Sequence, residues 1–273
     1  MTWSGWSIEP ALAYVALAAW LYWLGGRSYS RTPHEPLRAV AFAAGLVTIV
    51  LALDSPIDGY ADQLFWAHMT QHVLLLTVAP PLILLGRPWP RMWLGLPPAW
   101  RTTLGRGIAR AGWTAPLRAL ARPWPAWLLF NATIVLWHIP RAYEETLTSG
   151  IVHQVEHAMF FFTGLLFWAR VIDPGPLRPR LSWPARIAYV IGAMVVGWGL
   201  AIALVLSPDP LYPHYAALAH RPGGISALTD QQLAGGMMWV PGSLAYGIAA
   251  IFAFYRWLEP ESASRAHRPA LTT

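Results

Sequence analysis

The chain has 273 residues, of which 56% are hydrophobic and 12% are charged. An ordinary soluble domain carries about 25% charged residues, so this composition excludes a typical soluble enzyme and indicates a membrane protein with several spans. The absence of cysteine excludes both a disulfide framework and a thiolate metal site. The net charge of +6 comes from arginines in short loops, which predicts contacts with membrane lipid and no nucleic-acid partner.

Seven apolar segments have, or approach, the length of about 20 residues that a membrane span needs. They are Pro10–Leu24, Ala39–Leu53, Leu64–Leu85, Trp124–Ile139, Ile151–Ile172, Ala185–Leu206 and Gln232–Leu258. The sequence therefore predicts an all-α integral membrane protein in which residues 1–258 form a single bundle of seven transmembrane helices. Residues 259–273 are polar and are expected to form a disordered cytoplasmic tail.

Charge alternates from one predicted loop to the next. The loop at 86–123 holds seven arginines together with several tryptophans, whereas the loop after Leu53 holds Asp54, Asp58 and Asp62 and no arginine. Arginine-rich loops face the cytoplasm. This pattern places the N-terminus outside and the C-terminus in the cytoplasm. It also predicts that residues 86–123 form amphipathic helices on the cytoplasmic surface.

Two of the apolar segments carry the same polar signature near their outer ends. His68, Gln71 and His72 open the third segment, and His153, Glu156 and His157 open the fifth. Residues three and four apart share one face of a helix. Polar side chains inside a membrane are costly and usually functional, so we expect the four histidines to meet and to bind a metal ion, with Gln71 and Glu156 orienting them.

Further polar and sulfur-containing residues are expected at the same depth. The seventh segment follows Asp230 and places Met237 and Met238 one to two helical turns inside the membrane. We include both methionines among the predicted metal ligands and place Asp230 beside the site. The roles of His138, His214 and His220, which also lie toward the outer face, stay open.

Histidine and methionine without cysteine suit copper, above all Cu(I), for which thioether sulfur is a soft ligand. Imidazole alone would also accept zinc or iron. A copper site under the outer face of a membrane suggests receipt or delivery of the metal and no catalytic role.

Three stretches carry a resemblance to a known family. They are His68-Met-Thr-Gln-His72 with Ala79-Pro-Pro-Leu-Ile-Leu-Leu-Gly86, then His153-Gln-Val-Glu-His157, then Asp230-Gln-Gln-Leu-Ala-Gly-Gly-Met-Met-Trp-Val-Pro-Gly242. Together they resemble the CtaG-type cytochrome c oxidase assembly factors, which are seven-helix bacterial membrane proteins. The resemblance implies a non-enzymatic role in maturing a haem–copper oxidase, by delivery of copper to its metal centre. The implied partners are oxidase subunits and a periplasmic copper chaperone.

Three other functions are open on the residues alone. His153-x-x-Glu156-His157 has the order of one class of zinc metalloprotease, so the chain could be an intramembrane zinc hydrolase with Glu156 as its base. Paired histidines on facing helices could also serve as axial ligands of a haem. The last alternative is a receptor-like or scaffolding bundle without a metal.

Overall fold

The computed structural model describes residues 10–28, 33–112, 114–172 and 181–259. The described residues are helical, without a β-strand. The long helices are α1 (Pro10–Gly26), α2 (Glu35–Leu53), α9 (Pro123–Trp137), α11 (Gly150–Ile172), α12 (Trp183–Leu206), α14 (Ala227–Leu258) and the composite of α4 (Phe65–Val73), η1 (Leu74–Val78) and α5 (Ala79–Leu85). Each of the seven predicted spans therefore coincides with a helix.

Five of these helices are long and apolar enough to cross a membrane, which makes the chain a multi-pass membrane protein. The composite helix Phe65–Leu85 and the helices α11, α12 and α14 are four of them, and the fifth joins α2 to the short helix α3 (Pro56–Ala61). The other two predicted spans are shorter, with 17 residues in α1 and 15 in α9.

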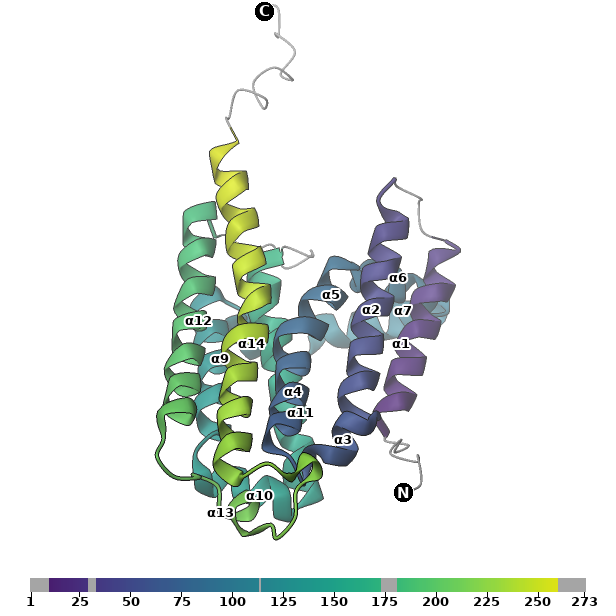
Figure 1. Ribbon diagram of the computed structural model, residues 1–273. Helices are drawn as coiled ribbons and strands as arrows, with labels where there is room; N and C mark the ends of the chain where they lie inside the picture. Colours follow the sequence, from purple (N-terminus) through teal and green to yellow (C-terminus); the bar gives the residue numbers. More distant parts are fainter. Residues whose placement is uncertain (1–9, 29–32, 113, 173–180, 260–273) are drawn as a thin grey trace, which may run out of the picture.

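The long helices stand roughly side by side, with α1 and α2 forming a pair at one side of the bundle, where α2 packs on α5 (Figure 1). The short helices α3, α10 (Pro140–Thr148) and α13 (Pro213–Ala217) close the lower end of this view. α1 begins at that end and α14 ends at the opposite one.

The composite helix changes its winding in the middle, and Pro80 explains why. Proline has no N–H to donate to the carbonyl four residues earlier, so Pro80 leaves the Leu76 carbonyl without its helical partner. The buried Trp168 of α11 supplies the missing donor, with its indole Nε1 3.0 Å from the Leu76 oxygen. The intervening turn is the π-helical η1. This bond ties the composite helix to α11, which carries the second histidine motif.

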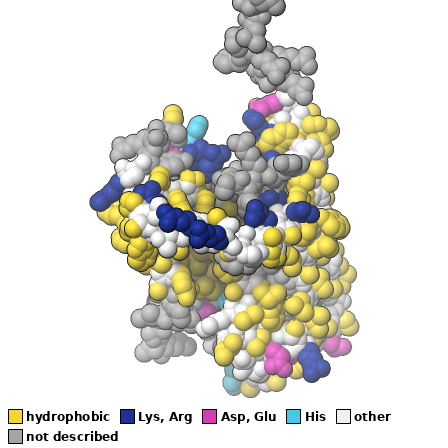
Figure 2. Space-filling model, turned by 180° about the vertical axis from the view of Figure 1, so that it is seen from behind, with side chains coloured by type: hydrophobic (Ala, Val, Ile, Leu, Met, Phe, Trp, Pro, Cys, Tyr) yellow, Lys and Arg dark blue, Asp and Glu magenta, His cyan; other side chains and the backbone are white. Residues whose placement is uncertain are grey.

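The predicted cytoplasmic segment forms three helices, α6 (Pro88–Gly95), α7 (Pro98–Arg110) and α8 (Thr114–Leu120). α6 packs closely on α1 because Gly25 and Gly95 have no side chains at the contact. Arg91 of α6 donates to the Tyr22 carbonyl of α1 and pairs with Glu35. Seen from behind, arginine side chains cross one level of the molecule while apolar side chains cover much of the face below (Figure 2). The predicted tail, apart from Glu259, lies outside the described residues.

Candidate metal centre

α4 brings His68, Gln71 and His72 into the protein, and Asp230 fixes where this helix begins. The two carboxylate oxygens of Asp230 accept hydrogen bonds from the backbone N–H groups of Phe65, at 2.9 Å, and Trp66, at 3.0 Å. These are N–H groups that a helix cannot satisfy internally, and a negative charge is favoured there. Asp230 therefore positions α4 and contributes no ligand to the histidine cluster.

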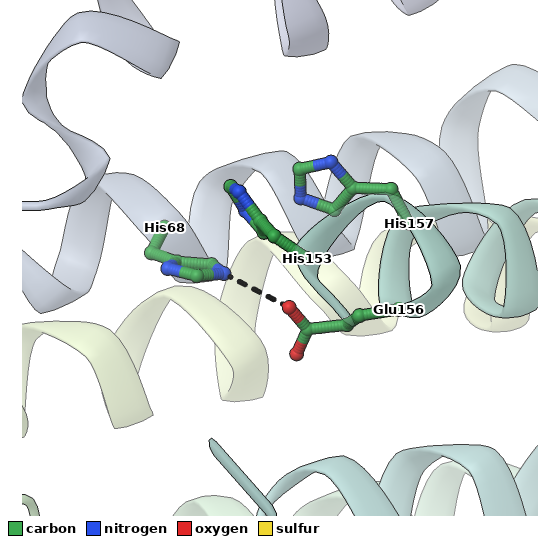
Figure 3. Close-up of side chains that lie close together, drawn as sticks. All are labelled: His68, His153, Glu156 and His157. Atoms are coloured by element: carbon green, nitrogen blue, oxygen red, sulfur yellow. Dashed lines mark ion pairs between the residues drawn. The ribbon is translucent and has the colours of Figure 1, made fainter. Parts of the chain in front are cut away.

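The two histidine motifs meet between α4 and α11, as the sequence predicts. One potential ligand atom from each of His68, His153, Glu156 and His157 lies within 4.8 Å of all the others. Figure 3 shows His68 reaching from one helix toward the three residues of the other. His72 lies beside this set, with its ring centroid 4.5 Å from that of His68 and 5.7 Å from that of His157.

Glu156 lies between the two histidines of α4 and is fully buried. One carboxylate oxygen is 3.4 Å from His68 Nε2 and the other is 3.4 Å from His72 Nε2. Among the described residues neither oxygen has a hydrogen-bond partner, and the same holds for Nε2 of His68, His72, His153 and His157. Buried polar atoms are nearly always satisfied, and a convergent group of exceptions points to a missing cation.

Tyr215 determines which ring nitrogen of His68 carries the proton and which carries the lone pair. Burial raises the pKa of Tyr215 well above its ordinary value, so the phenol keeps its proton. It donates that proton to the Ala61 carbonyl at 2.6 Å. The contact of 3.4 Å between the Tyr215 oxygen and His68 Nδ1 then requires Nδ1 to carry the ring proton. The lone pair of His68 is on Nε2, which faces Glu156.

Two electron-pair donors facing each other in a buried site need a cation between them. Ligands at the corners of a tetrahedron around a metal at about 2.1 Å are about 3.4 Å apart. The maximum separation of 4.8 Å between ligand atoms in the cluster exceeds this distance by about 1.4 Å. Rotation of the side chains can remove the difference. Three imidazoles and a carboxylate suit a transition metal, so the residues present fit a metal ion.

The other residues predicted for the site lie around the cluster. Gln71 donates to the Ala52 carbonyl and to Asp58, so its amide ties α4 to the end of α2 and to α3. Met238 lines a separate small cavity, and Met237 is half-buried in the same turn of α14.

Sequence reasoning left His138 without a role and passed over Met69. His138 Nε2 lies 3.2 Å from Met69 Sδ, and both side chains are buried. Met69 follows His68 directly, so its position in the first motif was visible in the sequence. A residue one place after His68 points about 100° away on a helix, and the facing partner on α9 could not be identified without the fold.

An apolar cavity of about 760 Å³ opens between the pair α1 and α2 and the helix α11. Most of its lining is hydrophobic, and His153, His157 and Asp58 also line it. The edge of the metal cluster formed by α11 therefore faces a space large enough for a bulky apolar group, while its other edge is packed against α4.

The fold and the cluster define a class: a multi-pass helical membrane protein with a buried group of histidines and one glutamate that could bind a metal. Residues 20–260 match the family of cytochrome c oxidase caa3 assembly factors, and the chain belongs to this family. The resemblance seen in the three sequence motifs is thereby confirmed.

Curated relatives come from mycobacteria and are themselves uncharacterized. Proteins of Mycobacterium bovis and Mycobacterium tuberculosis are each 27% identical over 247 residues, which is 85% of this chain and 36% of theirs. A protein of Mycobacterium leprae is 25% identical over 246 residues, 86% of this chain and 35% of its own. The chain thus spans about a third of the length of these relatives. No solved structure matches it.

Proposed function

We propose that this protein binds copper between α4 and α11 and delivers it to the metal centre of a haem–copper oxidase during assembly. One observation carries the proposal: buried nitrogen and oxygen atoms of His68, His153, Glu156 and His157 converge without hydrogen-bond partners among the described residues. The family contributes the process, because its members are assembly factors for a caa3-type oxidase. Delivery of a bound ion needs no catalytic step, so we propose no enzymatic activity.

The proposed topology follows from helix directions and arginine placement. The bundle has seven spans in the bacterial inner membrane, the N-terminus and the metal cluster lie toward the outside, and α6, α7 and α8 lie at the cytoplasmic surface. The cluster then sits where a periplasmic chaperone could supply copper. The cavity between α1, α2 and α11 reaches His153 and His157 from the side, which gives an oxidase subunit in the same membrane a route to the ion.

Two competing functions make different demands on the same residues. A haem would need its porphyrin plane between two axial nitrogens, whereas the ligand atoms here crowd within 4.8 Å together with a carboxylate. A zinc hydrolase would need Glu156 to face a metal-bound water as a base. Both oxygens of Glu156 instead face the histidines of α4, which favours a ligand or bridging role.

The test compares the full-length wild-type protein with a His68→Asn/His157→Asn variant. Both are purified in detergent, loaded with Cu(I) under reducing conditions and dialysed before elemental analysis. We expect the double variant to retain less copper than wild type, while His220→Asn, a substitution at an exposed histidine of the loop before α14, retains the wild-type amount. In cells at limiting copper, the double variant should yield an oxidase with haem but with little copper. Equal copper retention by wild type and double variant would rule out the site, and a normal oxidase would rule out delivery.

A further inference from the structure

A second group of metal-type ligands lies on the other side of His72. There, a cavity of about 50 Å³ is lined mainly by residues of α4, α9, α12 and α14. Its lining includes two histidines, His72 and His138, and three of the seven methionines of the chain, Met69, Met194 and Met238. These five residues come from four helices that are far apart in sequence, so the gathering of sulfur is a property of the fold.

The hydrogen bonds of His138 determine the state of its ring. Its Nδ1 lies 2.7 Å from the Ile134 carbonyl, which can only accept, so Nδ1 carries the proton. In the neutral ring Nε2 then has a lone pair. That lone pair faces Met69 Sδ at 3.2 Å, and thioether sulfur is also an electron-pair donor. Two such donors in a buried cavity are arranged as ligands of a shared cation.

The distance between the two atoms fits a shared ion. With bond lengths of about 2.0 Å to nitrogen and about 2.3 Å to sulfur, as at zinc sites, a separation of 3.2 Å corresponds to an angle of about 95° at the metal. This angle is possible in a distorted tetrahedral site. Met194 and Met238, which line the same cavity, are available as further sulfur ligands.

We propose that Met69, His138, Met194 and Met238 form a second metal site that takes a soft monovalent cation of the Cu(I) class. Thioether sulfur binds Cu(I) well and binds Zn²⁺ poorly, and the four side chains bring no negative charge to balance a divalent ion. His72 lines this cavity and also contacts Glu156 of the first cluster. The two sites are therefore neighbours, joined by one imidazole.

Packing alone is the competing explanation, since methionine often fills irregular gaps between helices. Packing accounts for three methionines around a small cavity. It gives no reason for the orientation of His138, whose free nitrogen points at sulfur while its N–H is held by the backbone. A water molecule in the cavity could donate a hydrogen bond to Nε2, but it would not explain why sulfur lies next to this nitrogen.

X-ray absorption at the copper edge of the full-length protein loaded with Cu(I) separates these explanations. We expect sulfur neighbours in wild type and in Met159→Leu, a methionine of α11 that packs against the core outside this cavity. The triple variant Met69→Leu/Met194→Leu/Met238→Leu keeps side-chain volume nearly constant, and it should lose the sulfur signal and one bound ion per chain. The unmutated protein labelled with selenomethionine should show selenium next to copper. This measurement tests the site even if the triple variant does not fold.

A copper shell of nitrogen and oxygen only, in both the wild-type and the selenomethionine protein, would overturn the proposal. Retention of the sulfur signal by the triple variant would also overturn it. The readout is coordination in the purified chain, so it is independent of whether the ion is delivered to an oxidase.

Discussion

Replacing Glu156 with glutamine tests whether this buried carboxylate exists for a metal or for the fold. At a metal–oxygen distance of about 2.1 Å and an effective dielectric constant of about 20, a carboxylate attracts a unit positive charge by about 8 kcal/mol. Desolvation of the two charges offsets most of this attraction. We therefore expect a net loss of about 1.4–2.8 kcal/mol in metal binding, which is about a 10- to 100-fold weaker affinity.

The metal-free protein should respond in the opposite direction. A buried carboxylate whose charge no cation neutralises is destabilising, and a neutral group of the same shape removes that penalty. The Glu156→Gln variant without metal should therefore unfold at the same temperature as wild type or at a higher one. A residue kept for the fold would instead lower the unfolding temperature when it is replaced.

The assay measures copper retained against a graded series of Cu(I) chelators, together with thermal unfolding of the metal-free proteins in detergent. Glu145→Gln, at an exposed position of α10, is the matched control and should change neither quantity. Unchanged affinity in Glu156→Gln would refute the reasoning, as would a large fall in the stability of the metal-free protein.

Three further substitutions test contacts that position the histidine cluster or hold α1 against α6. Tyr215→Phe removes the oxygen beside His68 Nδ1 and should weaken metal binding by about 10-fold with the helices intact, as measured by chelator competition and circular dichroism. Asp230→Asn keeps one acceptor for the start of α4 but loses the charge, and should destabilise by about 1 kcal/mol, seen as a fall of about 2–4 °C in the unfolding temperature. Gly25→Ala would place a carbon 1.7 Å from the Arg91 carbonyl and should separate α1 from α6, measured as faster proteolysis near α6. Gly107→Ala, which meets open space, should leave proteolysis unchanged.

The sequence predicts the long helices well because apolar length is a strong signal, and all seven predicted segments are helical. It misses the short helices α3, α10 and α13, which have too few residues to show a hydrophobic period. Each of them begins with a proline, at Pro56, Pro140 and Pro213. Proline is favoured in the first turn of a helix, so these starts were visible in principle.

The histidine cluster could be predicted because spacing along one helix fixes which residues share a face, and two matching motifs at one depth imply a meeting. Contacts between helices could not be predicted in this way. Helix periodicity does not show that Glu156 reaches both His68 and His72, or that Asp230 accepts hydrogen bonds from the start of α4. Met238, predicted as a ligand of the histidine cluster, lines the cavity beside His138.

The two proposed sites differ in the charge of their ligands, and this difference can be tested. Glu156 is the only carboxylate among the four clustered ligands, and the methionine cavity has none in its lining among the described residues. Coulomb attraction scales with the charge of the ion, so Glu156→Gln should lower the affinity for Zn²⁺ by about twice as many powers of ten as the affinity of the same cluster for Cu(I). The sulfur signal of Cu(I) in the methionine cavity should persist in this variant. Equal losses for the two ions would mean that Glu156 does not act on the metal through its charge, and loss of the sulfur signal would mean that the two ligand groups form a single site.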